Sequence, residues 1–437
     1  MTFTMIEKLK GFREFYPEDI RERNKIFRSA ERISRVFGYE EISFPSLEPL
    51  DLFRIKSGEE IMRQTYSFTD KGGREVTLIP EATPSVSRML AERKDIPRPV
   101  RWYSFQKFWR YEEPQSGRLR EFYQYNADLF GSYSTVSDAE IIALAGSILN
   151  DLGLKGLYSI RVNHRGMMEK LLRQFGAEHP EKLLPVIDRY HKMERDDIEM
   201  EMEKAGLDSS RVRALEGILE KQVPLNGIRQ FLSENGVEFT SIDEISWLEH
   251  VAELLSSYGI NEAVFDASVV RGFNYYTGIV FEAFDIKGDN RAILGGGRYD
   301  NLTSVISGTE IPAVGFGMGD VVLELVMRSA GIWREENNDL RVSLCLTSVE
   351  FLKEVLPLMT EIRNSGISVL IPPEIKNLSS QMADAAKNRS RFAIIIGKKE
   401  IDGGEATVRD MISGEQYHVP FSTLKGWFLK KRSESDI

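Results

Sequence analysis

Hydrophobic residues change their period along the chain, and these changes predict where helices and strands lie. Residues 18–37 carry apolar side chains near helical spacing, which predicts an amphipathic helix that ends at Gly38. Residues 101–113 and 121–131 alternate aromatic and polar side chains, which is typical of strands. The polar, arginine-bearing segment between them predicts the loop of one long hairpin.

Shorter patterns extend this scheme on both sides of the hairpin. Residues 76–85 predict a strand that runs into a proline-marked turn, followed by a helix over 86–93. Residues 138–152 predict a helix with Ser137 as its N-cap. Strand patterns return over 264–296.

The rest of the chain divides into an insertion, a linker and a second domain. Residues 165–258 are charged and largely helical in pattern, and we interpret them as a helical insertion without core sheet elements. A polar stretch over 331–341 predicts a linker. Beyond it, short strands alternate with helices, which predicts a small α/β domain with a largely parallel sheet. We therefore expect one domain over 1–330 and another over 340–437.

Composition narrows the classes of function. A net charge of −10 argues against a protein that coats nucleic acid, yet residues 88–120 are basic, which indicates a confined anionic ligand. The single cysteine, Cys345, excludes an internal disulfide, fits a reducing cytoplasm and is expected to be buried. No apolar run approaches the roughly 18 residues that span a bilayer. We therefore expect a cytoplasmic protein.

Several common site motifs are absent from the sequence. The histidines are scattered without the spacing of a zinc site, so we expect no structural metal bound by the protein. Neither a Gly-x-x-x-x-Gly-Lys-Ser/Thr phosphate loop nor a Gly-x-Ser-x-Gly elbow occurs. GGGRYD at 295–300 and GFGMGD at 315–320 are glycine-rich, and taken alone they favour close backbone packing over ligand binding.

Two stretches indicate binding chemistry. The hairpin carries arginine forks that suit phosphate oxygens and aromatic rings that suit adenine. Its candidate residues are Arg110, Glu112, Arg118, Phe122, Gln124 and Asp128. In VVRGFNYYTGIVFE, at 269–282, an arginine and two tyrosines precede a strand pattern, as in a polar pocket for a small zwitterion. An ordinary solvated hairpin remains the alternative interpretation of each stretch.

Together these motifs resemble a known enzyme family. The hairpin is similar to motif 2 of class II aminoacyl-tRNA synthetases, while PEATPS at 80–85, VRGFNYYTG and GGGRYD resemble histidyl-tRNA synthetase. The similarity runs from Gly11 to about Arg328, and residues 340–437 match the anticodon-binding domain of that family in position and length. The resemblance implies an α+β catalytic domain with the antiparallel class II synthetase sheet, a helical insertion and a C-terminal α/β anticodon-binding domain. It also implies a histidine–tRNA ligase, which forms histidyl-adenylate from histidine and ATP and charges its tRNA.

By the same resemblance, one set of residues binds histidine: Glu81, Thr83, Gln124, Asp128, Arg271, Tyr275, Tyr276 and Tyr299. Glu81 and Thr83 would hold the amino group, and the tyrosines would line the imidazole pocket. Arg271 would lie against the histidine carboxylate and the α-phosphate of ATP. Because these two anions must approach each other, a fixed cation between them serves the reaction.

A second set would bind ATP and support catalysis. Arg110, the other catalytic candidate, would contact the α-phosphate, and Arg118 the outer phosphates. Glu112 would contact the adenine amino edge, and Phe122 the adenine face. Magnesium would accompany ATP by bridging its phosphates. The expected partners are tRNA(His) and a second copy of the chain, paired through residues 18–45.

The sequence departs from the family pattern at three positions. Asp128 stands where glutamate is usual, and Asn274 replaces an aspartate before the tyrosines. Val322 occupies the place of the motif 3 arginine, which binds the γ-phosphate in this class. We expect a cation of the hairpin, such as Arg118 or Arg120, to take that place. The alternative is a non-catalytic, histidine-sensing regulatory subunit of ATP phosphoribosyltransferase, which typically lacks the anticodon-binding domain.

Overall fold

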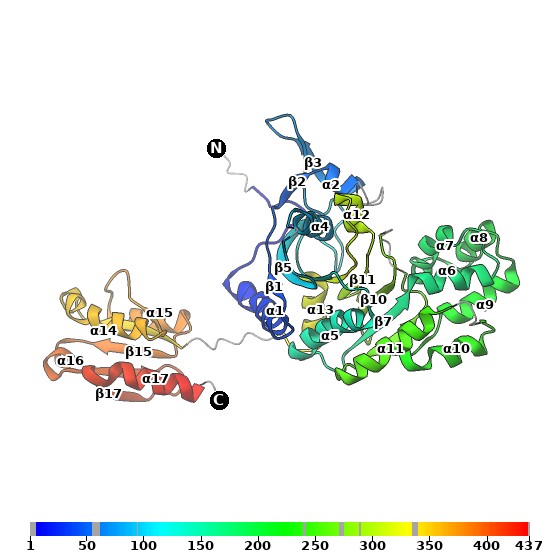
Figure 1. Cartoon of the computed structure of the whole chain (residues 1–437). Coiled ribbons are helices and arrows are strands. Elements are labelled where there is room, and N and C mark those ends of the chain that lie inside the picture. The colour runs from blue at the N-terminus through cyan, green and yellow to red at the C-terminus, as the bar shows by residue number, and fades with distance from the viewer. Residues whose placement is uncertain are drawn as a thin grey trace. The chain divides into compact units, whose positions relative to one another are not determined.

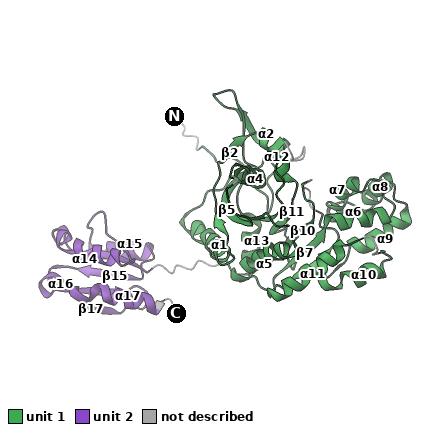
Figure 2. Ribbon diagram, in the orientation of Figure 1, with its two compact units in different colours: residues 1–334 green, residues 335–437 purple. Residues whose placement is uncertain are grey.

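The chain forms two compact units, residues 1–334 and 335–437, each with its own hydrophobic core (Figure 2). The computed structural model describes residues 6–54, 62–93, 95–238, 242–270, 275–287, 290–333 and 340–435. Arg271 and Asn274, which were singled out from the sequence, lie outside these ranges.

A large, mainly antiparallel sheet forms the centre of the first unit. Among the described residues its strands are, in spatial order, β1 (Glu40–Glu41), β5 (Val100–Trp109), β6 (Glu121–Phe130), β12 (Ala313–Gly319), β11 (Leu294–Arg298), β10 (Ile279–Asp285), β7 (Tyr158–His164), β9 (Ala263–Asp266) and β8 (Gln222–Pro224). Only the pairs β1–β5 and β7–β9 are parallel within the described sheet. The predicted antiparallel synthetase sheet is thereby confirmed, and the predicted hairpin is the pair β5–β6.

The sheet separates two layers of packed side chains. On one face lie α1 (Pro17–Val36), α5 (Thr135–Asp151) and α13 (Asp320–Ser329). On the other lie α2 (Asp51–Arg54), α4 (Thr83–Glu92), α12 (Leu302–Ser307) and a small sheet of β2 (Leu47–Pro49), β4 (Glu75–Leu78) and β3 (Tyr66–Thr69) (Figure 1). Because strand side chains alternate between faces, each residue of β5 and β6 is assigned to one layer by its position alone.

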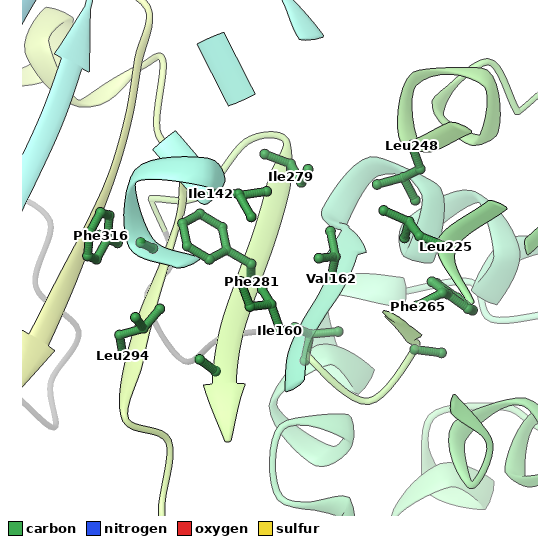
Figure 3. Packing of buried hydrophobic residues seen from close by; sticks show 14 of the residues in the cluster. Ile142, Ile160, Val162, Leu225, Leu248, Phe265, Ile279, Phe281, Leu294 and Phe316 are labelled. Carbon is green, nitrogen blue, oxygen red and sulfur yellow. The ribbon is translucent and has the colours of Figure 1, made fainter. Parts of the chain in front are cut away.

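Residues 165–258 form a largely helical region at one end of this unit (Figure 1). Its helices are α6 (Arg165–Gln174), α7 (Pro180–Ile187), α8 (Arg195–Lys204), α9 (Ser209–Leu219), α10 (Ile228–Glu234) and α11 (Glu244–Ser257). The expectation that this region lacks core sheet elements is wrong, because β8 pairs with β9 at the edge of the large sheet. Its apolar side chains also join the core of the sheet: Leu225 and Leu248 lie toward Phe265 and Val162 (Figure 3). A single core therefore connects the insertion to the large sheet.

The second unit is an α/β domain built on a mixed sheet. Its strands, in spatial order, are β14 (Ser368–Leu370), β13 (Arg341–Leu346), β15 (Phe392–Ile396), β16 (Glu405–Asp410) and β17 (Gln416–Pro420). Its helices are α14 (Leu352–Asn364), α15 (Leu378–Lys387), α16 (Lys398–Gly403) and α17 (Leu424–Ser435). β13 pairs in parallel with β14 and β15, whereas β16 pairs antiparallel with both β15 and β17. The sheet is therefore mixed instead of largely parallel as predicted. Cys345 is buried in β13, as predicted, and burial raises the pKa of its thiol to about 11.

Local signals also placed two helix starts too late. The N-cap of α5 is Ser134, whose hydroxyl accepts from the backbone amide of Ser137 at 3.2 Å. Helix α4 begins at Thr83, three residues before the predicted start, with Pro84 in its first turn. Proline is compatible with the first turn because its missing N–H has no partner there in any helix.

Candidate active site

Strand β6 presents the predicted hairpin residues on one face. Phe122, Gln124 and Asp128 are separated by even numbers of residues, so their side chains leave the strand on the same side. The intervening Tyr125 and Ala127 belong to the opposite layer, with α1 and α5. Phe122 instead packs toward Phe108 of β5, at a ring separation of 6.0 Å. The alternation along β6 thus defines the face on which a ligand would lie.

The neighbouring strand β12 leaves room for these side chains through its glycines. Gly315 pairs with Asp128 across the β12–β6 register, and a Cβ at Gly315 would lie 2.1 Å from Asp128 Oδ1. A Cβ at Gly317 would lie 2.3 Å from Gln124 Nε2. The predicted close packing of the GFGMGD stretch is confirmed, and here it accommodates two candidate histidine-binding side chains.

Asp128 belongs to a buried polar group with Glu81, Tyr275, Tyr276 and Tyr299, which we call the Asp128 cluster. The Tyr299 hydroxyl donates to Asp128 Oδ1, and the Tyr275 hydroxyl donates to Glu81 Oε2 at 3.1 Å. The Tyr275 ring lies 4.9 Å from that of Tyr276 and 6.0 Å from that of Tyr299. Residues from four separate sequence motifs therefore meet in one buried group.

Burial dominates the electrostatics of this cluster. Asp128 is 5% exposed, and burial raises its pKa to about 7, although the Tyr299 hydroxyl bond acts in the opposite direction. Burial also raises the pKa of Tyr299 well above its ordinary value, with the Asp128 carboxylate adding to the effect. A cationic or N–H-donating ligand beside Asp128 would favour the ionised carboxylate. It would offset part of the free-energy cost of burying that charge.

The PEATPS segment connects this cluster to the hairpin. Arg110 donates from Nε to the backbone oxygen of Pro80 at 3.0 Å, which holds the segment against the end of β5. Glu81 follows directly, and Thr83 is the half-buried first residue of α4. Thr83 therefore lies two residues from Glu81, at the start of α4, where the first backbone amides have no partner within the helix.

Four residues of the hairpin form a second group, the Arg110 cluster: Arg110, Glu112, Arg118 and Phe122. The Arg110 guanidinium lies 5.4 Å from the centre of the Phe122 ring, and Arg118 Nε lies 2.7 Å from Glu112 Oε2. Burial lowers the pKa of Arg110, whereas the carboxylates of Glu112 and Glu81 raise it. Because Glu81 belongs to the Asp128 cluster, this interaction links the two groups electrostatically.

Sequence reasoning missed a buried network beside Tyr299. Arg298, which is 1% exposed, donates to Asp138 Oδ1 at 2.6 Å and to Asp300 Oδ1 at 3.0 Å. These bonds fix the backbone on both sides of Tyr299 and anchor it to α5. In the sequence, the available signal for this network was the pair Arg298 and Asp300, which flank Tyr299 in GGGRYD. An arginine that becomes buried requires acidic partners.

Comparisons with known proteins identify the family of this chain. Residues 11–320 match the family described as "Histidyl-tRNA synthetase", and residues 341–431 match "Anticodon binding domain". The chain belongs to the histidyl-tRNA synthetase family. It is 44% identical to "Histidine--tRNA ligase" of Thermoplasma volcanium, over 98% of this chain and 99% of that protein. It is also 44% identical to the protein of that name from Picrophilus torridus, over 94% and 96%.

The fold agrees with a solved member of the family. The crystal structure of histidyl-tRNA synthetase from Nostoc sp. PCC 7120 covers 98% of this chain and 100% of its own, with a TM-score of 0.84 at 22% identity. Among the helices of the described ranges, none is long and apolar enough to cross a membrane.

Proposed function

We propose that the Asp128 cluster binds histidine and that the Arg110 cluster binds ATP in the reaction of a histidine–tRNA ligase. The chain is an ATP-dependent aminoacyl-tRNA ligase for histidine, as its full-length similarity to histidine–tRNA ligases indicates. The convergence of PEATPS, the hairpin, the two tyrosines of VRGFNYYTG and GGGRYD on one buried group is the observation that supports the residue assignments.

In the first step, a carboxylate oxygen of histidine attacks the α-phosphorus of ATP. The bond from that phosphorus to the bridging oxygen breaks, and pyrophosphate leaves. Arg110 and Arg271 would stabilise the charge that develops at the α-phosphate. In the second step, a hydroxyl of the terminal tRNA ribose attacks the histidyl carbonyl, and AMP leaves.

Selection of histidine would rest on Asp128 and the tyrosines. A buried hydrogen-bonding group rejects an apolar amino acid strongly, because that group would remain unpaired. Asp128→Ala should therefore weaken the apparent affinity for histidine and leave that for ATP nearly intact. Equal losses for both substrates would place Asp128 outside the amino-acid site.

Magnesium would be held mainly by ATP itself. Within the described ranges no three or more His, Cys, Asp or Glu residues are grouped as metal ligands. Mg²⁺ commonly binds through substrate phosphates with one or two carboxylates, so it does not require a larger cluster of protein ligands. Its contribution when bound is to neutralise charge on the leaving pyrophosphate.

The experiment that tests the function is histidine-dependent exchange between ATP and pyrophosphate by the purified chain. A ligase incorporates labelled pyrophosphate into ATP only when histidine is present. A histidine-sensing regulatory subunit would bind histidine without this exchange. The match to an anticodon-binding domain over 341–431 favours the ligase. We further propose that the chain acts in the cytoplasm as a homodimer paired through residues 18–45.

A further inference from the structure

Val322 occupies the position of the motif 3 arginine. A valine cannot supply the positive charge of that arginine. Val322 lies in the first turn of α13, is 8% exposed, and packs in the core on the α1 and α5 face. An uncharged, buried side chain at this position leaves the outer phosphates of ATP without one expected partner.

The expected replacements from the hairpin already have other contacts. Arg118 is paired with Glu112. Arg120 donates from Nε to the backbone oxygen of Glu112 at 2.9 Å, and its guanidinium lies 4.2 Å from the centre of the Tyr111 ring. Arg120 therefore holds the base of the loop together, and the hairpin does not offer an obvious second phosphate ligand.

Arg291, between β10 and β11, reaches the same place from another part of the chain. A Cβ at Gly117, in the hairpin loop, would lie 3.3 Å from Val322 Cγ2 and 3.4 Å from Arg291 Cδ. The Val322 and Arg291 side chains therefore both lie against Gly117. In the described part of the chain, the exposed Arg291 has no hydrogen bond or ion pair.

The electrostatics of Arg291 indicate an anion site. Partial burial lowers its pKa, the positive charge of Arg118 lowers it further, and Glu112 raises it. The positive charges of Arg118 and Arg291 are therefore close enough to repel each other, and Glu112 interacts with both. A polyphosphate bound beside them would convert this repulsion into attraction.

We propose that Arg291 replaces the missing motif 3 arginine and binds the γ-phosphate end of ATP, beside Arg118. The inference rests on the proposed ATP site of the Arg110 cluster. It assigns the compensating cation to the β10–β11 connection instead of the hairpin. Because the γ-phosphate leaves with pyrophosphate, Arg291 serves ATP binding more than the attack on the α-phosphate.

Equilibrium binding of Mg·ATP, ADP and AMP to the full chain tests this assignment directly. Losing one charge-assisted hydrogen bond weakens affinity by about tenfold to a hundredfold. Arg291→Ala should weaken ATP by this factor and leave AMP unchanged, since AMP lacks the outer phosphates. Arg213→Ala, on the exposed side of α9, is the matched control and should change neither. Unchanged ATP affinity in Arg291→Ala, or an equal loss for AMP, would overturn the proposal.

A second variant tests whether Arg291 and position 322 serve the same phosphate. Val322→Arg should restore ATP affinity in the Arg291→Ala background and add little to the wild-type chain. If Arg291→Ala weakens ATP binding and Val322→Arg does not restore it, Arg291 contacts another part of the triphosphate. That result would refute the proposed replacement.

The binding measurements keep this inference separate from the proposed function. A wild-type chain without histidine-dependent exchange, but with ATP affinity that depends on Arg291, would contradict the ligase function alone. Active exchange with ATP affinity independent of Arg291 would contradict the inference alone.

Discussion

At the scale of single residues, Asp128 combines a buried position with a titratable group. Its carboxyl has a pKa of about 7 in the folded chain, raised by burial, against about 3.9 in an unfolded chain. Between about pH 4 and pH 7 the folded chain therefore holds more protons at this site than the unfolded chain. The free energy of unfolding falls as the pH rises through this window.

We expect Asp128→Asn to remove this pH dependence. The wild-type chain should lose more thermal stability between about pH 5 and pH 8 than the variant does, measured as Tm at both values. Asp196→Asn, at an exposed position of α8, is the control and should follow the wild type. Parallel pH dependence in wild type and Asp128→Asn would mean that the carboxyl does not titrate in this range.

Arg271 is predicted from the resemblance alone, since it lies outside the described residues. A cation placed where charge develops typically contributes about 10²–10³ in rate. Arg271→Ala should lower kcat for adenylate formation by this factor at saturating histidine and ATP. Arg328→Ala, an exposed residue of α13 paired with Glu324, is the control. An unchanged kcat with a raised KM would indicate uniform binding of substrate and transition state instead.

At the scale of elements, strand β12 shows how a glycine-rich strand leaves room for the side chains of a neighbouring strand. Two of its glycines, Gly315 and Gly317, lie against candidate side chains of β6. Gly319 belongs to the same strand, but a Cβ there would meet nothing within 4 Å, and its φ of −81° suits any residue. Gly315, which is closely packed, and Gly319, which is not, are therefore a matched pair of positions for substitution by alanine.

Gly315→Ala should destabilise the chain and impair histidine binding, whereas Gly319→Ala should do neither. The added methyl at Gly315 meets Asp128 Oδ1 at 2.1 Å and the backbone oxygen of Ala127 at 2.8 Å, so the strand or the carboxylate must move. Overpacking of this kind costs about 1–3 kcal/mol. Thermal unfolding and the KM for histidine measure the two effects. Equal behaviour of the two variants would show that the spacing around Asp128 is not limiting.

At the scale of the whole molecule, the two units have separate cores, and the predicted site residues that the structure describes all belong to the first. A truncated chain of residues 1–333 should therefore still form histidyl-adenylate. It should charge tRNA poorly, because the part that matches an anticodon-binding domain is missing. Pyrophosphate exchange and tRNA charging by the folded, dimeric truncated chain would measure both. Charging at the full rate would contradict the proposed role of residues 340–437.

The sequence by itself determined the alternation of β5 and β6, and hence which of their side chains share a face, because the strand period is a local property. It also determined the family, because several motifs each carried part of the resemblance. Local sequence signals were less precise at the ends of helices. The N-cap of α5 is Ser134 instead of Ser137, and α4 begins at Thr83, before the predicted start. The strand β8 inside the insertion was missed because three residues carry too little pattern to distinguish a strand from a loop.

Only the tertiary structure decided which distant residues meet. Glu81 and Tyr275 are far apart in the sequence, and so are Asp128 and Tyr299, yet each pair shares a buried hydrogen bond. The sequence located the missing cation at Val322, whereas Arg291, the replacement that we propose, comes from another part of the fold. Arg291 is remote from both Val322 and the hairpin loop along the chain, and nothing in its local pattern marks it. Long-range packing brought these side chains together, and packing of this kind depends on the whole fold rather than on any short stretch of sequence.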